Sequence, residues 1–368
     1  MGTYLYAILP AAGSRPDLGH LGLPDGGTPV VLLPGSGLAA VVSEYRGPAF
    51  GTLPRDQLLR LLALHQRVIE RTMDARTVLP VKFGTVLASA DQARAALDHW
   101  QRPLATALEE LGNTVEIEVA ASWDLKQTFA EIGRQPEIAA LAAQAAGQPP
   151  EASLATRVQV GKQVKAALDQ RRAAYRARVV AELAPWATDL QPNPLPSDEL
   201  VLNLAFLVER ARRDGFYAQV HRLDAAFAGQ LTFRCIGPLP PYSFATVELV
   251  PPCPEEIDAA RRLLGLGDWA SEAEANASYR RLAARAHPDR HPNDPTATER
   301  FAALAAAHTR VLAYLHGQRG DAGQGDERRR YDLRCPAVAA LPLLVLKRSQ
   351  PEFPAGVEAS YERDPTAV

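Results

Sequence analysis

Two histidines, His287 and His291, stand four residues apart, the spacing that places two zinc ligands on one face of a helix. A proline follows each histidine and breaks that helix, and no glutamate adjoins the first one to act as a base. The three cysteines, Cys235, Cys253 and Cys335, are an odd number and contain no Cys-x-x-Cys pair. We therefore predict no metal site, and cysteines that stay reduced and structural.

A glycine turn at Gly35-Ser36-Gly37 has the outward form of a dinucleotide-binding loop. Such a loop needs a helix N-terminus to receive the pyrophosphate, whereas Pro34 precedes this turn and the strand-like Val41-Val42 follows it. We predict a tight turn between two strands. His65 lies among the apolar positions of a helical pattern, where a lone histidine is more often a satisfied or half-buried residue than a ligand or a base.

The sequence lacks a nucleophile elbow, a phosphate loop with Gly-Lys-Ser/Thr and a suggestive pair of carboxylates. We predict neither an enzyme nor a cofactor. A site assembled from residues far apart in the chain is the alternative that this pattern leaves open.

The strongest local signal is a short basic helix that ends in a His-Pro-Asp sequence. Ser271 and Glu274 have the spacing of a capping box, which predicts that the helix begins there, and Pro288 predicts its end. Within a chain of net charge −2, the stretch from 279 to 290 is distinctly positive. Its basic residues are Arg280, Arg281, Arg285 and Arg290, against the single acid Asp289.

This pattern resembles the J domain of the Hsp40 co-chaperones over about residues 255–334. An upstream helix ends in Leu263-Leu264-Gly265-Leu266, a third helix carries apolar residues at helical spacing, and residues 327–332 look like the fourth helix of the family. The apolar residues of the third helix are Phe301, Leu304, Val311 and Leu312. Ala275 and Ala286 replace larger apolar residues of the family, so we expect a J core that buries less apolar area.

The resemblance implies an Hsp70 partner. In that family the basic helix docks on an acidic surface of the Hsp70, and the His-Pro-Asp turn couples docking to ATP hydrolysis. Carried over, the Hsp70-binding residues are His287, Pro288, Asp289, Arg280, Arg281 and Arg285. Arginine suits this task because its guanidinium pairs with carboxylates in a fork geometry.

Four further segments, in order along the chain, resemble the gas vesicle accessory family GvpL/GvpF. They are Tyr4–Ile8, His65–Ile69, Val78–Val86 and, most specifically, Ile236–Phe244, with its Gly-Pro-Leu-Pro-Pro-Tyr-Ser-Phe sequence. The family lacks known enzymes. Its members are two-domain α+β proteins with a ferredoxin-like first domain, implicated in assembling gas vesicles and in contacting the shell protein.

The resemblance implies contact with the shell protein GvpA and with other gas vesicle accessory proteins. We interpret the matched residues as mainly structural, because their types are those that set turns and fill cores. They are Phe83, Gly84, Gly237, Pro238, Pro240, Pro241, Tyr242 and Phe244. The similarity is weaker at Asn113–Val119, where the family has a Trp-Gly pair after its Val-Glu.

Apolar periodicity predicts an α+β architecture with five parts. Residues 1–122 form an N-terminal α+β domain, of ferredoxin-like fold if the family resemblance holds, and residues 123–188 form a helical arm. Residues 189–253 form a second α+β domain of the same or a related kind, with a helix over 201–211 and strands at 216–223, 230–236 and 244–250. The J-like module, predicted to be all-α, follows at 255–334. Residues 335–368 combine a short apolar segment, suited to a strand or a short helix, with a polar tail.

Composition limits the partners. Lys and Arg number 40 and Asp and Glu 42, so nothing global favours nucleic acid or an anionic membrane. No apolar run approaches the ~20 residues of a membrane helix, and the first residues lack the pattern of a signal peptide. We expect a cytoplasmic protein associated with gas vesicles.

The two resemblances together predict an assembly factor that binds the shell protein and recruits Hsp70. One alternative is a minor structural or nucleating component of the vesicle whose J-like module is degenerate. Another is an Hsp40 with an unrelated client.

Overall fold

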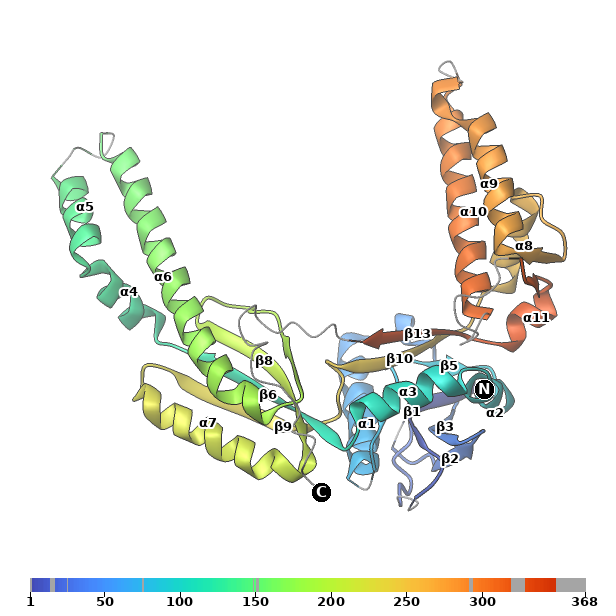
Figure 1. The fold of residues 1–368 in the computed structure, drawn as a ribbon, viewed down its shortest axis with the longest axis horizontal. Coiled ribbons are helices and arrows are strands. Elements are labelled where there is room, and N and C mark those ends of the chain that lie inside the picture. The colour runs from blue at the N-terminus through green and yellow to red at the C-terminus, as the bar shows by residue number, and fades with distance from the viewer. Residues whose placement is uncertain are drawn as a thin grey trace, which may run out of the picture. The chain divides into compact units, whose positions relative to one another are not determined.

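The computed structural model describes residues 2–13, 17–24, 26–74, 76–147, 149, 152–290, 294–318 and 328–348. Its helices and antiparallel strands form two compact units (Figure 1). One unit comprises the chain up to Gly112 together with Ala245–Arg348, and the other comprises Asn113–Phe244. The α+β class predicted from the sequence is confirmed.

The first unit is built around β1 (Gly2–Pro10), in which residues 3–9 are all buried. Its sheet has the order β2 (Val30–Pro34), β3 (Leu38–Tyr45), β1 and β4 (Leu79–Pro80), and β5 (Val86–Leu87) also pairs with β1. Three helices, α1 (Arg55–Met73), α2 (Ala90–His99) and α3 (Gln101–Leu111), accompany it. A short 3-10 turn, η1 (Phe50–Thr52), precedes α1.

Two local predictions for this unit are confirmed. The glycine turn at residues 35–37 joins β2 to β3, and Gly37 has a φ of 76°, which glycine adopts without strain. On α1, Leu61, His65, Val68 and Ile69 are buried at the i, i+4, i+7, i+8 spacing that marks one helix face.

The first unit also contains a two-stranded sheet from the C-terminal part of the chain, which an isolated bridge links to the main sheet. Val81 forms a parallel bridge with Val247 of β10 (Ala245–Val250), and the Lys82 N–H donates to the Val247 carbonyl at 2.7 Å. β13 (Leu343–Arg348) then pairs antiparallel with the whole of β10. The apolar segment near the C-terminus therefore divides into the short helix α11 (Cys335–Ala340) and this strand.

A helical module lies between β10 and β13. Its helices are α8 (Pro254–Leu263), α9 (Glu272–Ala286), the 3-10 turn η4 (Pro288–Arg290) and α10 (Ala297–Gln318). The predicted fourth helix at 327–332 is wrong where the structure describes it. β12 (Arg330–Asp332) is instead a strand, because it pairs with β11 (Trp269–Ser271) at the start of α9. Glu327 lies outside the described residues.

The second unit has one sheet and a helical arm. The strand order is β7 (Asp189–Pro192), β8 (Leu200–Glu209), β6 (Thr114–Ser122) and β9 (Thr232–Leu239). The helices are α4 (Leu125–Gly133), α5 (Pro136–Ala146), α6 (Leu154–Leu183) and α7 (Arg213–Phe227), with 3-10 turns η2 (Ala184–Trp186) and η3 (Arg210–Arg212). The domain predicted at residues 1–122 includes β6, whereas β6 pairs with β8 and β9 in the second unit.

Two predicted elements of this unit are wrong, because a predicted helix is a strand and a predicted strand is part of a helix. The predicted helix at 201–211 is mostly β8, which lies between β7 and β6 and is buried along nearly its whole length. A strand covered on both faces shows an unbroken apolar run, which periodicity does not distinguish from a buried helix. The predicted strand at 216–223 belongs to α7, whose buried Phe216, Val220, Leu223 and Phe227 follow helical spacing.

Candidate functional site

The basic helix α9 begins and ends where its sequence predicts. Ser271 Oγ accepts from the Glu274 N–H at 3.2 Å, and the Ser271 N–H donates to Glu274 Oε2 at 2.7 Å, which completes the capping box. At the other end His287 has extended backbone angles because Pro288 cannot continue the helix. The capping box fixes the start of the helix, and the proline fixes the position of the turn.

The His-Pro-Asp turn is held by contacts within the module. The His287 ring meets Phe301 of α10 edge to face at 5.3 Å between centroids, and the Arg290 N–H donates to the His287 carbonyl at 3.0 Å. The Asp289 N–H donates to His287 Nδ1 at 3.3 Å. The His287 side chain is 45% exposed and that of Asp289 is 89% exposed. The turn therefore exposes the Asp289 carboxylate almost fully and the His287 side chain in part.

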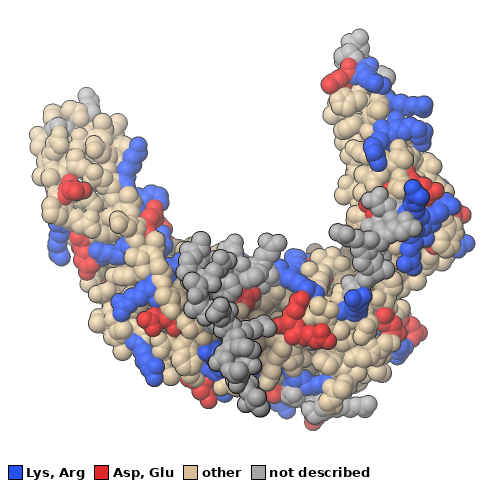
Figure 2. All heavy atoms as spheres, in the orientation of Figure 1, with Lys and Arg blue, Asp and Glu red and all other residues tan. Residues whose placement is uncertain are grey.

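The three predicted arginines of α9 are all exposed, and Figure 2 shows Lys and Arg side chains along the side of the module where α9 lies in Figure 1. Arg281 and Arg285 are one helical turn apart and share a face. Arg281 donates to Ser278 Oγ at 3.1 Å, and Arg280 Nε donates to the Asn276 carbonyl at 3.3 Å. The three arginines therefore lie on α9, and the His-Pro-Asp turn directly follows the C-terminal end of that helix.

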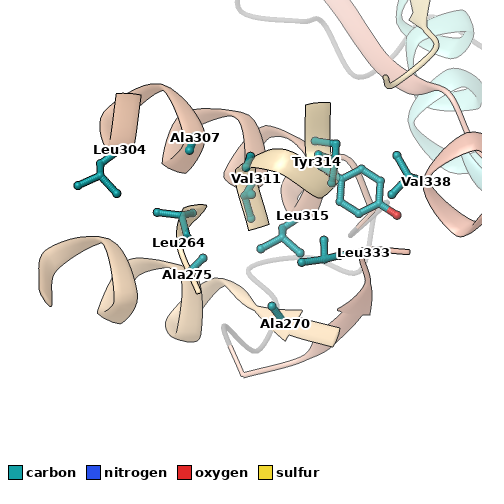
Figure 3. Packing of buried hydrophobic residues seen from close by; sticks show 12 residues of the cluster. Leu264, Ala270, Ala275, Leu304, Ala307, Val311, Tyr314, Leu315, Leu333 and Val338 are labelled. Carbon is teal, nitrogen blue, oxygen red and sulfur yellow. The ribbon is translucent and has the colours of Figure 1, made fainter. Parts of the chain in front are cut away.

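The core beneath α9 contains both of the alanines singled out in the sequence, and residues beyond the third helix complete it. Ala275 is fully buried, and Ala286 packs partly buried against the same cluster. Leu333, after β12, and Val338 of α11 are also fully buried, beside Tyr314 (Figure 3). Leu333 and Val338 were not predicted from the sequence, because their burial depends on the pairing of β11 with β12 and on the return of the chain through α11.

The Gly-Pro-Leu-Pro-Pro-Tyr-Ser-Phe segment is anchored by a buried carboxyl group. The Ser243 N–H and Oγ donate to the two oxygens of Glu116 at 2.8 and 2.7 Å. Glu116 is 2% exposed, and burial raises its pKa to about 7, although the two hydrogen bonds from Ser243 lower it. The neighbouring Glu118 carboxylate raises it further. The segment is thus tied to β6.

The other residues of that segment have packing or backbone roles. Gly237 has a φ of 153°, and a Cβ there would lie 3.0 Å from the Glu116 carbonyl oxygen, so a larger residue is crowded. The Gly237–Pro238 bond is cis. Phe244 is 4% exposed, Pro240 and Pro241 are buried, and Tyr242 is half-buried.

Phe83 and Gly84 belong to an aromatic cluster of the first unit. The Gly84 N–H donates to the Tyr4 hydroxyl at 3.1 Å, and Gly84 has a φ of 88°. The Phe83 ring meets the His65 ring edge to face at 5.6 Å. Tyr4 Oη and His65 Nδ1 are 2.9 Å apart, and burial lowers the pKa of His65 to about 4. His65 is a buried core residue.

Within the described ranges, no group of three His, Cys, Asp or Glu side chains is placed to hold a metal ion. His291 lies outside those ranges, so the predicted absence of a His287–His291 site is not tested by geometry. Cys235, Cys253 and Cys335 are all free thiols. None of the helices in the described part of the chain has the length and apolarity needed to cross a membrane.

Comparison with known proteins finds a family match for each of two parts of the chain. The family described as "Gas vesicle synthesis protein GvpL/GvpF" matches residues 2–246. The chain belongs to the GvpL/GvpF family. Gas vesicle protein F of Streptomyces sp. (strain CB03234) is 34% identical over 251 residues, which cover 66% of this chain and 99% of the relative. Gas vesicle protein F2 of Halobacterium salinarum (strain ATCC 700922 / JCM 11081 / NRC-1) is 26% identical, over 58% of this chain and 78% of the relative.

The fold of this GvpL/GvpF part is also that of a solved relative. The crystal structure of the gas vesicle protein GvpF from Anabaena sp. PCC7120 superposes with a TM-score of 0.59 at 23% identity, over 66% of this chain and 97% of that chain. The C-terminal part of the chain contains a J domain, because residues 262–313 match the DnaJ domain family. DnaJ-like protein 1 of Saccharomyces cerevisiae (strain ATCC 204508 / S288c) is 43% identical over 70 residues, 19% of this chain and 14% of that protein.

Proposed function

We propose that this GvpL/GvpF protein is a gas vesicle assembly factor that binds the shell protein GvpA and recruits an Hsp70 through its J domain. The observation that carries the proposal is the His-Pro-Asp turn, with Asp289 89% exposed at the end of a basic helix, on a chain that belongs to a gas vesicle family. Other gas vesicle accessory proteins are further partners in this proposal, and its site of action is the cytoplasm and the growing vesicle.

The chemistry of the J domain supports docking on an acidic surface. The guanidinium groups of Arg280, Arg281 and Arg285 offer forked N–H donors that pair with carboxylates in two parallel hydrogen bonds. The turn adds the exposed carboxylate of Asp289. The Asp289 N–H donates to His287 Nδ1, and the His287 ring packs against Phe301. ATP hydrolysis takes place in the Hsp70, and the turn supplies contacts that favour the hydrolysing state.

The attachment of the J domain supports the coupling of the two activities. β10, which begins at the C-terminal end of the GvpL/GvpF match, leads directly into α8, and β13 returns after α11 to pair with β10 along six residue pairs. The Trp100 Nε1–H donates to the Pro342 carbonyl at 3.0 Å, and Gln92 Nε2 donates to the Ala339 carbonyl at 2.8 Å. Both ends of the J domain are therefore attached to the gas vesicle family domain.

An Hsp70 ATPase assay tests the proposal. We expect the full chain to stimulate single-turnover ATP hydrolysis by an Hsp70 of the same cell, and His287→Gln to abolish the stimulation without loss of helicity. His316→Gln is the matched control, because His316 lies at the far end of α10, where it pairs with Glu272. Equal stimulation by wild type and His287→Gln would contradict the recruitment of Hsp70.

Recovery of both partners from cells tests the coupling. Tagged wild-type and Asp289→Asn proteins should recover equal amounts of GvpA, while Hsp70 should accompany the wild type alone. GvpA without Hsp70 in either sample would favour the alternative, a minor structural or nucleating component of the vesicle. That component should remain on washed, purified vesicles at a fixed stoichiometry. Hsp70 without GvpA would favour an Hsp40 with another client.

A further inference from the structure

We propose that residues 349–368, here called the acidic tail, dock on the arginine face of α9 formed by Arg280, Arg281 and Arg285 in the same chain. Docking of the tail does not depend on the proposed function. Its consequence, competition with an Hsp70 for the arginine face, rests on the proposed function of the J domain.

The tail is acidic enough to bind an arginine surface and too polar to form a core of its own. Its charged residues are Glu352, Glu358, Glu362, Arg363 and Asp364, four acids against one base. This net charge of −3 exceeds that of the whole chain, which is −2. The same twenty residues contain three prolines and two aromatic residues, Phe353 and Tyr361. Such a composition favours binding along a complementary surface over independent folding.

Arg280 and Arg281 differ from most other arginines of the J domain. Six of those pair with carboxylates of the same module, as in Arg300–Asp294 at 2.7 Å and Arg334–Asp332. The other four are Arg261, Arg262, Arg310 and Arg330. Among the described residues, Arg280 and Arg281 have no carboxylate partner and donate only to Asn276 and Ser278 of their own helix. Two exposed guanidinium groups are therefore available to an acidic segment.

The tail is long enough to reach this face. Leu343, the first residue of β13, packs against Gly317 near the end of α10, and the adjacent His316 pairs with Glu272 at the start of α9 at 3.1 Å. Arg281 lies about 14 Å further along α9, at ~1.5 Å per residue.

The remaining steps of this path are also short. The length of β13 adds about 17 Å, and the crossing between the two helices adds about 10 Å. The whole path from Arg348 is about 40 Å, whereas twenty extended residues span up to about 66 Å. Glu362 and Asp364 therefore reach the arginine face.

Covalent attachment makes weak ion pairs sufficient. Exposed ion pairs are individually weak and are screened by salt. A segment tethered over this length has an effective concentration in the millimolar range, so a modest affinity gives substantial occupancy. An Hsp70 must then displace the tail, and a partner that captures the tail would expose the J domain.

The first test uses the full chain with a neutralised tail, in which Glu352, Glu358 and Glu362 become Gln and Asp364 becomes Asn. A fluorescent peptide of residues 349–368 is titrated at low and high salt and followed by anisotropy. We expect it to bind the neutralised chain at least fivefold more tightly than the wild type, and to bind weakly at high salt. Adding Arg280→Gln, Arg281→Gln and Arg285→Gln should remove the binding. Equal peptide affinity for all three proteins would overturn the proposal.

The second test separates docking from the proposed function. The neutralised chain should stimulate Hsp70 ATPase at a several-fold lower concentration than the wild type. Peptide binding that depends on the three arginines, with no ATPase stimulation by either chain, would support docking and contradict Hsp70 recruitment. Equal stimulation by both chains, with no peptide binding, would support recruitment and contradict docking.

Discussion

Glu116 is the residue that explains the most specific motif of the family match. Its carboxyl group is buried in β6, where both oxygens accept from Ser243. Removing such a buried acceptor leaves two donors without partners, which typically costs about 1–3 kcal/mol each. The motif is therefore a segment tied to the sheet, and its prolines and aromatic residues shape and pack that segment.

The raised pKa of Glu116 predicts a pH-dependent stability. Between pH 4.5 and about 7 the folded state keeps a proton that the unfolded chain releases, so the free energy of unfolding falls as pH rises through this window. The difference between these pKa values corresponds to about 3 kcal/mol. Glu116→Gln should remove this fall. Hydrogen exchange of β6 and β9 at pH 5 and pH 8, read by mass spectrometry, measures it.

His65 provides the opposite dependence in the other unit. Its pKa of about 4 is below its ordinary value of 6.5, so stability is full above pH 6.5 and is lost as pH falls toward 4. The protection factor, which is the exchange rate of the unfolded chain divided by that of the folded protein at the same pH, should therefore fall in α1 below pH 6 and rise in β6. An identical pH profile of β6 in wild type and Glu116→Gln would show that Glu116 does not titrate as described.

At the scale of elements, the packing of α7 against η2 requires a glycine at position 215. A Cβ on Gly215 would overlap the ring of Trp186, which also lies under the Arg212 guanidinium at 5.5 Å. We expect Gly215→Ala to lower the free energy of unfolding by about 1–3 kcal/mol, because the rigid ring must move. The helix propensity of alanine alone would predict a gain.

Gly161 offers the matched control for that substitution. It lies within α6, and no atom lies within 4 Å of a Cβ built there. Gly161→Ala should raise the stability of α6 by up to about 1 kcal/mol. Denaturant unfolding followed by circular dichroism compares the two variants. A gain at both positions would mean that Trp186 moves aside without cost.

At the scale of the whole molecule, β13 determines how firmly the J domain is attached. Leu344 and Leu346 are half-buried and pair with Leu249 and Val247 of β10, which are themselves buried. A chain ending at Pro342 should lose about 3 kcal/mol of stability through the exposed apolar area. Limited proteolysis between β10 and α8 should become at least tenfold faster.

A chain ending at Arg348 is the control, since both truncations remove the acidic tail and only one removes β13. Equal proteolysis rates for the two chains would show that the pairing of β10 with β13 does not stabilise the attachment.

Local signals in the sequence determined much of this protein. The capping box, the prolines and the helical spacing of apolar residues act within a few residues, so α1, α9, the glycine turn and the His-Pro-Asp turn follow from them. The two family resemblances rest on the same kind of local sequence. These signals do not reveal which segments cover the two faces of an element. For that reason the strand β8 was predicted as a helix, and part of the helix α7 was predicted as a strand.

Only the tertiary structure decided the contacts between residues far apart in the chain. Glu116 meets Ser243 across 127 positions, and β10 meets β13 across about a hundred, so no periodicity or short motif records either pairing. Burial on both faces erases the alternation of β8, and strand pairing makes an extended segment of Arg330–Asp332. These features depend on the complete sheet and core, because the hydrogen-bond partners of a strand and the residues that shield it from water come from distant parts of the sequence.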